Sequence, residues 1–249
     1  MKVAITGSSG FIGSHLKERL IKDENEVIEW DLRINKPIQN FDLEGIDYVI
    51  HLAAYADVRA SIDDPNRYWE NNVINTTRIQ RMCFDAGVPL LYASSSCIHN
   101  WWLSPYGVSK KVNEETAFEG QVGLRFTTVY GKGARDTMLI GRLVNGTAKY
   151  LTNHVRDFIH VDDVVEAICV LMSKDIYTLK EAYDIGTGYG VIVSDLGKIA
   201  DLDVPVKVGD ACEALDNTAD IEDLKALGWK PTRDVKLYVQ ANTIGGVPI

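Results

Sequence analysis

The hydrophobic positions of this chain follow two alternating periods. Short apolar runs, typical of buried strands, are separated by stretches in which apolar residues recur at helical spacing. We interpret as strands residues 2–6, 26–30, 48–52, 90–93, 123–126, 158–160 and 182–185. We interpret as helices residues 11–21, 66–86, 106–119 and 161–172. Strands that alternate with helices across short loops predict an α/β fold of the Rossmann type, with a doubly wound parallel sheet.

Two regions depart from this regular alternation. Only residues 32–47 separate the second and third predicted strands, and Pro37 interrupts them. Because a parallel crossover usually needs a dozen residues or more, we expect any helix there to be vestigial. After Phe126 the alternation becomes irregular, which indicates a smaller appended portion.

A glycine motif stands between the first predicted strand and the first predicted helix. Its small residues, Gly7, Gly10 and Gly13, allow a tight turn and the close approach of a pyrophosphate to the helix N-terminus. Asp31 ends the second strand, where a carboxylate accepts hydrogen bonds from a ribose hydroxyl and repels a 2′-phosphate. Arg33 is close enough in sequence to accept that phosphate instead. The pattern predicts NAD rather than NADP as the cofactor.

A second set of residues suggests acid–base chemistry. Tyr106 and Lys110 are four positions apart, which places them on one face of a helix. A tyrosine pKa near 10 must fall by about 3 units for the phenol to act as a base near neutral pH, and an ammonium group and an oxidised nicotinamide can cause that shift. The serines at 94–96 come just after the fourth predicted strand, at the sheet edge where such folds bind ligands. A serine hydroxyl there could bind a substrate hydroxyl and pass its proton to Tyr106.

Composition and charge narrow the class of protein. The net charge of −9 argues against nucleic acid as a partner, and no apolar run is long enough to cross a bilayer. The four cysteines form no Cys-x-x-Cys pair, so neither a zinc site nor a disulfide framework is expected, and we expect a reducing, cytoplasmic location. Residues 132–156 carry a local excess of positive charge, which is typical either of a solvated face or of a diphosphate site.

Taken together, these motifs resemble the extended short-chain dehydrogenase/reductases of the NAD-dependent nucleotide-sugar epimerase/dehydratase family. The resemblance is to members like UDP-galactose 4-epimerase, with features of GDP-fucose synthase. It covers nearly the whole chain and rests on residues 6–13, 51–54, 71–73, 94–96, 105–110, 129–131, 156–163, 184–188 and 227–231.

The resemblance implies roles for individual residues. Tyr106 would be the acid/base, Lys110 would tune it and bind the cofactor ribose, Ser95 would bind the sugar, and Arg156 would face the diphosphate of a nucleotide sugar. The implied cofactor-binding residues are Gly7, Gly10, Phe11, Ile12, Gly13, Asp31, Leu32, Asp42, Leu43, Leu52, Ala53, Ala54, Asn72, Tyr106 and Lys110. The implied substrate-binding residues are Ser95, Ser96, Thr128 and Arg156, and no metal is expected.

The resemblance also implies an organisation and an assembly. Residues 1–131 and 157–178 would form the NAD-binding Rossmann domain. Residues 132–156 and 179–249 would form a small, discontinuous substrate-binding portion. Helices 66–86 and 106–119 would pair two copies of the chain into a homodimer.

Three functions remain open from the sequence. We favour epimerisation of a nucleotide sugar at C4, by transient oxidation to a keto sugar. The run 95–98 also resembles GDP-fucose synthase and GDP-mannose 3,5-epimerase, in which Cys97 would transfer protons beside a ketone, although Met138 stands near where the partner histidine is expected. Ser96 and Cys97 replace the Asp-Glu of dehydratases, which argues against dehydration. The third possibility is an NAD-sensing protein without turnover, because the substrate portion is reduced. Trp101 and Trp102 would either floor the sugar pocket or pack internally.

Overall fold

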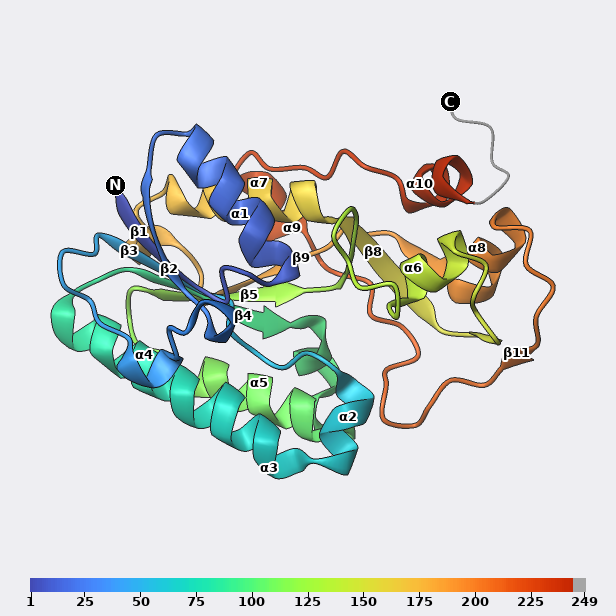
Figure 1. The fold of residues 1–249 in the computed structure, drawn as a ribbon, viewed down its shortest axis with the longest axis horizontal. Coiled ribbons are helices and arrows are strands. Elements are labelled where there is room, and N and C mark those ends of the chain that lie inside the picture. The colour runs from blue at the N-terminus through green and yellow to red at the C-terminus, as the bar shows by residue number, and fades with distance from the viewer. Residues whose placement is uncertain (244–249) are drawn as a thin grey trace.

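The computed structural model describes residues 1–243, and its centre is a parallel sheet (Figure 1). In spatial order the strands are β2 (Glu26–Trp30), β1 (Lys2–Thr6), β3 (Tyr48–His51), β4 (Leu90–Ser95), β5 (Gln121–Phe126) and β9 (Ala182–Ile185). Every neighbouring pair runs parallel. The predicted Rossmann-type α/β fold is therefore confirmed. The strand order reverses between β1 and β3, so the carboxyl ends of these strands border the crevice where such sheets bind ligands.

Helices cover both faces of this sheet (Figure 1). On one face α1 (Phe11–Lys22) packs beside α7 (Val161–Met172), and the apolar sides of both helices are buried against the strands. Leu16 and Leu20 of α1 are almost fully buried, as are Val164 and Ile168 of α7. These are the positions that helical spacing assigns to the core, so the pattern of apolar residues determines which side of each helix faces the sheet.

The other face carries the long helical stretch predicted at residues 66–86. It consists of α3 (Pro65–Tyr68), a π-helical turn η3 (Trp69–Ile74) and α4 (Asn75–Ala86), with α5 (Pro105–Glu115) alongside. Helical spacing places Trp69 on the buried face with Val73, but its side chain is 47% exposed and Tyr68 is buried instead. Trp69 departs from regular helical spacing because it begins the wider π turn, which rotates it relative to α4.

The short connection between β2 and β3 contains only two single-turn 3₁₀ helices, η1 (Leu32–Ile34) and η2 (Ile38–Asn40). The vestigial helix expected there is thus confirmed. After β3 the chain forms α2 (Val58–Asp63), and after β4 it forms the irregular helix η4 (Ser96–Leu103). These two segments border the carboxyl edge of the sheet.

The smaller portion has its own apolar core. It contains a three-stranded sheet of β10 (Gly190–Ile192), β8 (Val155–His160) and β6 (Thr128–Tyr130), and a pair of β11 (Val206–Lys207) with β7 (Leu151–Thr152). Its helices are α6 (Leu139–Val144), α8 (Val193–Ile199) and α10 (Val235–Asn242). The short helix η5 (Ile176–Thr178) precedes β9 in the chain, and α9 (Glu222–Ala226) contacts β9 in space. The sequence-based boundaries are wrong for β9, because this strand pairs with β5 and completes the large sheet.

Candidate active site

The glycine motif forms a tight turn between β1 and α1. Gly7 has a φ of +72°, and a Cβ there would lie 2.8 Å from the Ala53 nitrogen. A Cβ on Gly13 would lie 2.1 Å from the Gly7 carbonyl oxygen, so only glycine lets α1 approach the turn this closely. Among residues 1–243, no side chain caps the N-terminus of α1. Its first amides can therefore bind an anion such as a pyrophosphate.

Asp31 lies at the carboxyl end of β2, beside the same turn. Its carboxylate accepts hydrogen bonds from the Ser9 amide at 3.1 Å and from the Arg33 amide at 2.8 Å. The Arg33 guanidinium reaches back and donates to the Ser9 carbonyl at 2.6 Å. The buried Ser8 hydroxyl has no partner among the described residues. A tight glycine turn, free helix amides and an acid at the end of the second strand fit a dinucleotide with an unmodified ribose.

The other residues assigned to the cofactor lie around this crevice. Leu32 on η1 is exposed, and Asp42 and Leu43 lie in the following connection. The half-buried Leu52, Ala53 and Ala54 follow β3, where Ala53 donates to the Thr6 hydroxyl. Phe11 and Ile12 begin α1.

Asn72 is placed differently from a simple cofactor ligand. Its amide oxygen accepts from the Tyr55 amide at 2.9 Å, and its amide nitrogen donates to the Tyr55 carbonyl and to Ser109. These bonds connect the loop after β3 to α5. The side chain is fully buried, and its amide oxygen and nitrogen already form hydrogen bonds with other protein groups.

Ser95, Tyr106 and Lys110 come together at the carboxyl end of β4. Ser95 is the last residue of β4 and accepts a hydrogen bond from the Cys97 amide at 3.2 Å. Tyr106 and Lys110 share one face of α5, and the Lys110 ammonium lies 5.8 Å from the centre of the Tyr106 ring. Lys110 also donates to the Ala93 carbonyl at 2.7 Å. All three side chains are buried, so their charges interact in a medium with little water.

The backbone and ring of Tyr106 are held by neighbouring elements. Its amide donates to the buried Ser61 hydroxyl at 3.1 Å, and its carbonyl accepts from Ser109. The Tyr68 ring meets the Tyr106 ring edge-on, with centroids 6.2 Å apart. Ser61 and Tyr68 were not singled out from the sequence, because their contact with Tyr106 depends on α2 and α3 packing against α5.

The electrostatics of this group favour neutral forms in the absence of a bound cation. Burial raises the pKa of Tyr106 well above its usual value, and the neighbouring Cys97 acts in the same direction, while the Ser95 hydroxyl lowers it. Burial lowers the pKa of Lys110 to about 7. Burial also raises the pKa of the Cys97 thiol, so the thiol is protonated at neutral pH. Ionising Tyr106 therefore requires added positive charge close to its oxygen.

The residues assigned to the substrate are placed in two groups. Ser96 is buried, and its hydroxyl accepts a hydrogen bond from the side-chain amide of Asn217 at 3.4 Å. Thr128 begins β6 and is half-buried. Arg156 on β8 donates to the Ala214 carbonyl at 2.7 Å and pairs with the Glu213 carboxylate at 2.8 Å. Arg156 influences the pKa of Cys97, so it lies close to the Ser95 and Tyr106 group, but its guanidinium already has protein partners.

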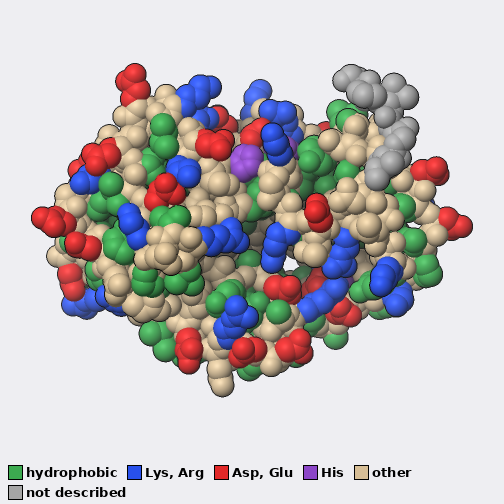
Figure 2. All heavy atoms as spheres, viewed as in Figure 1, with side chains coloured by type: hydrophobic (Ala, Val, Ile, Leu, Met, Phe, Trp, Pro, Cys, Tyr) green, Lys and Arg blue, Asp and Glu red, His purple; other side chains and the backbone are tan. Residues whose placement is uncertain are grey.

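The basic stretch 132–156 does not act as one patch. Burial raises the pKa of Cys97 and of Tyr68, and Arg156 and Arg135, respectively, oppose part of that rise. Lys132, Arg142 and Lys149 are exposed. Figure 2 shows a hollow in the middle of this face, with Lys and Arg side chains around it and Asp and Glu side chains at its lower rim.

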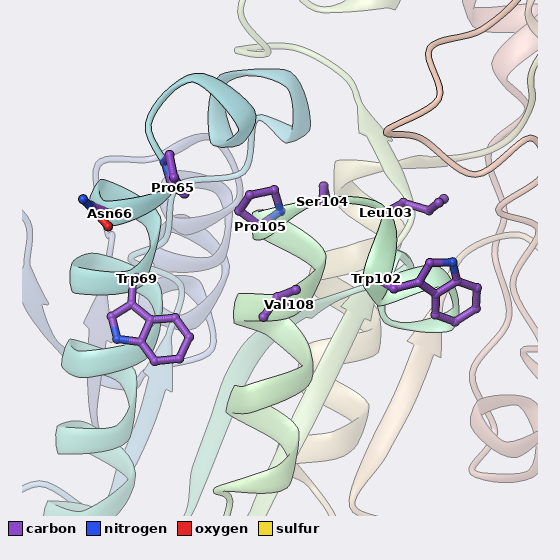
Figure 3. Close-up of a pocket in the computed structure, with 8 residues that line it drawn as sticks. All are labelled: Pro65, Asn66, Trp69, Trp102, Leu103, Ser104, Pro105 and Val108. Carbon is purple, nitrogen blue, oxygen red and sulfur yellow. The ribbon is translucent and has the colours of Figure 1, made fainter.

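The two tryptophans at 101 and 102 do not pack in the interior. Trp101 is 39% exposed and Trp102 is 60% exposed. Trp102 lines a surface groove of about 410 Å³, together with Trp69 and residues of α3, η4 and α5. In Figure 3, Trp69 and Trp102 lie on either side of α5, and Val108 projects between them. Internal packing, one of the two roles expected from the sequence, is therefore excluded for Trp102.

Three charged residues near the site were missed entirely by the sequence analysis. Arg59 on α2 pairs with Asp210 at 2.7 Å and with Glu213 at 2.9 Å. Nothing in the local sequence marks these residues, because they come from segments far apart in the chain. Among residues 1–243, no group of three His, Cys, Asp or Glu side chains is arranged to hold a metal ion.

Comparison with known proteins identifies the family. Residues 3–186 match the model of the family described as NAD dependent epimerase/dehydratase family. The chain belongs to this family. The resemblance found in the sequence, the expected NAD dependence and the assignment as an enzyme are thereby confirmed. No helix among residues 1–243 combines the length and apolar character needed to span a membrane.

Individual relatives and solved structures are similar to this chain over most of its length. Protein CapI from Staphylococcus aureus is 32% identical over 87% of this chain and 83% of its own length. A putative UDP-glucose 4-epimerase from Methanocaldococcus jannaschii is 28% identical over 94% of each chain. The solved structure of MoeE5 in complex with UDP-glucuronic acid and NAD is 28% identical, covers 98% of each chain and has a TM-score of 0.85.

Proposed function

We propose that this family member is a UDP-sugar 4-epimerase that uses NAD. The observation that supports the proposal most strongly is the meeting of Ser95, Tyr106 and Lys110 at the carboxyl end of β4, beside a turn that fits a dinucleotide. The relatives named as UDP-glucose 4-epimerases, and the structure of MoeE5 with UDP-glucuronic acid, support a UDP-hexose or UDP-hexuronate as substrate.

In this proposal the protein moves one proton and holds the sugar. Bound NAD supplies a reversible acceptor for hydride at the sugar carbon. Ser95 hydrogen-bonds the 4-hydroxyl group, and Tyr106 removes its proton through that contact. The form of Tyr106 that takes this proton is the phenolate, which Lys110 in its ammonium form stabilises, and Tyr106 is a neutral phenol once the proton has been transferred. When hydride has returned to the opposite face, Tyr106 gives the proton back to the sugar oxygen, so the cycle leaves no net change in the protein.

The placement of Cys97 keeps a second function in view, a 3,5-epimerase or keto-sugar reductase. The thiol lies beside Ser95 and Tyr106, which is where a proton-transferring group would act. Burial raises its pKa, however, whereas removal of a proton from carbon requires the thiolate. A protonated thiol at Cys97 therefore favours 4-epimerisation. The retained group of Ser95, Tyr106 and Lys110 also argues against a protein that only senses NAD.

The test is NMR of the products formed from UDP-glucose, UDP-galactose and UDP-glucuronic acid in D₂O. Direct return of hydride predicts the 4-epimer with no deuterium on carbon, and Cys97→Ser should be nearly silent. The matched control is Cys169→Ser, because Cys169 is a half-buried cysteine on α7. Deuterium at C3 or C5 that disappears in Cys97→Ser would establish the second function instead.

We also propose that the protein is a cytoplasmic homodimer. Support comes from the outer side of the helices at 65–86 and of α5, where Trp69, Ile74 and Phe84 are each exposed by more than 40% of their surface. Together with the groove of Figure 3, these side chains give an apolar face that a second copy could cover.

A further inference from the structure

Two arginines from different parts of the molecule share one carboxylate. Arg156 Nη2 lies 2.8 Å from one oxygen of Glu213, and Arg59 Nε lies 2.9 Å from the other. Arg156 belongs to β8 in the smaller portion, whereas Arg59 belongs to α2 beside the large sheet. The Glu213 carboxylate thus bridges the two portions in the way that an anionic ligand with several oxygens would.

We propose that Arg59 is a second ligand for the diphosphate of the sugar nucleotide, and that Glu213 occupies its place until the substrate displaces the carboxylate. This inference rests on the proposed function, in which Arg156 binds that diphosphate. It adds Arg59 as a binding residue and Glu213 as a competing internal anion, and it names the ligand class as a nucleoside diphosphate.

The three charges lie near the proposed sugar site, because the side-chain amide of Asn217, four residues after Glu213, donates to the hydroxyl of Ser96 at 3.4 Å, next to Ser95. Arg156 lowers and Glu213 raises the pKa of the Cys97 thiol, so both lie within electrostatic reach of the residue that contacts Ser95. In a nucleotide sugar the diphosphate is attached directly to the sugar. A sugar held at Ser95 and Tyr106 would therefore place its diphosphate next to the pair of arginines.

The burial of these groups makes it unfavourable for Glu213 and a diphosphate to bind there together. The side chains of Arg156 and Glu213 are only 11% and 19% exposed. The Arg59 side chain is 46% exposed, so a carboxylate and a diphosphate that share the two cations repel each other most strongly beside the buried Arg156. One of the two anions must leave, and the one carried by a loop can move.

The loop that carries Glu213 is fixed at its two ends. The Gly209 amide donates to the Asn153 side chain, and the Leu215 carbonyl accepts from the Val155 amide at 2.8 Å. Displacing Glu213 thus requires a rearrangement of residues 210–214 alone. Residues 208–217 contain acidic side chains but no lysine or arginine, so this loop cannot itself supply a second cation for the diphosphate. Arg59 supplies it from α2.

The experiment is calorimetric titration of the NAD-loaded protein with UDP and, separately, with UMP. Glu213→Gln removes the carboxylate that both arginines share and keeps the size of the side chain, while Asp210 still pairs with Arg59 at 2.7 Å, so UDP should bind about tenfold more tightly. Arg59→Gln should weaken UDP binding about tenfold. Both changes should be much smaller for UMP, which lacks the second phosphate. The matched control is Glu222→Gln on α9, which breaks the exposed pair with Lys225 and should leave UDP binding unchanged.

Unchanged or weaker UDP binding in Glu213→Gln would show that this pair only holds the loop, and would overturn the inference. Unchanged binding in Arg59→Gln would overturn the role of Arg59. UDP binding does not require turnover, so the two proposals fail separately. 4-Epimerisation by the wild type, with no tightening of UDP binding in Glu213→Gln, would overturn the inference alone. Tighter binding of UDP by Glu213→Gln without 4-epimerisation would overturn the proposed reaction alone. A wild type that does not bind UDP would overturn both proposals.

Discussion

The Asp31 carboxylate accepts a hydrogen bond from the Ser9 amide at 3.1 Å, which connects the end of β2 to the glycine turn. The same turn is contacted from its other side by Arg33, whose guanidinium donates to the Ser9 carbonyl. The acidic and the basic side chain that would discriminate between NAD and NADP are therefore both hydrogen-bonded to Ser9. The choice depends on which of them faces the ribose.

Asp31 should make the protein prefer NAD. A carboxylate at the end of β2 repels a 2′-phosphate, so NADH should bind more tightly than NADPH, and Asp31→Asn should narrow the difference. Fluorescence titration of both nucleotides measures it. Glu29→Gln, on the same strand and paired with Lys17, is the control and should leave the preference intact. Tighter binding of NADPH by the wild type would mean that Arg33 governs the site.

Replacing Tyr106 by phenylalanine should abolish turnover and leave NAD binding nearly intact. Loss of a general acid/base typically lowers the rate by about 10²–10⁴-fold. Steady-state kinetics and NADH titration of the same preparation separate the two effects. Tyr68→Phe is the control, because Tyr68 touches Tyr106 but donates its hydroxyl to the Asp57 carbonyl. Equal losses in both variants would contradict an acid–base role for Tyr106.

Asp157→Asn should destabilise the protein. Asp157 is fully buried on β8, and its carboxylate accepts from the Thr187 amide and hydroxyl, the Gly188 amide and the Ala219 amide. An asparagine would turn an NH₂ group toward some of these donors, which should cost about 3 kcal/mol in the free energy of unfolding. Urea denaturation measures it. Asp216→Asn, at an exposed carboxylate that accepts from Thr218, should cost far less.

The stability of the protein should depend on pH through His51. Its ring is buried between the hydroxyls of Thr6 and Thr76, and burial lowers its pKa to about 3. An unfolded histidine has a pKa near 6.5, so between pH 6.5 and 3 the unfolded state binds a proton at His51 and the folded state does not. The contribution of neutral His51 to the free energy of unfolding is complete above pH 6.5. It is lost as the pH falls toward 3, by about 1.4 kcal/mol per pH unit.

Urea denaturation of the wild type and of His51→Gln between pH 7.5 and 4.5 isolates this proton. The difference in unfolding free energy between the two proteins should shrink as the pH falls. A difference that stays constant with pH would mean that His51 is protonated in the folded state as readily as in the unfolded state.

Light scattering should show a homodimer at micromolar concentration. Trp69→Glu places a charge on the exposed side of η3 and should shift the protein toward the monomer, since a buried unpaired charge is costly. Tyr177→Glu, at an aromatic side chain that is 61% exposed on η5, is the control. A wild type that is only monomeric would rule out the proposed assembly.

The sequence by itself determined the features that depend on neighbours along the chain. The strands and helices of the Rossmann fold follow from periods in apolar residues, and the glycine turn follows from residues between 7 and 13. The meeting of Tyr106 and Lys110 follows from one turn of a single helix. The shortened crossover after β2 was predictable because sixteen or so residues with a proline cannot build a full helical connection.

Only the tertiary structure decided the features that depend on distant segments. The π turn that exposes Trp69, the pairing of β9 with β5, and the sharing of Glu213 by Arg59 and Arg156 leave no periodic signal. The physical reason is that a charge pair or a strand pairing is a relation between two surfaces, and those surfaces exist only after each segment has buried its apolar side. The residues that form the sheet could be read along the chain, whereas the partners of the arginines were set by how α2 and the loop at 208–217 come together.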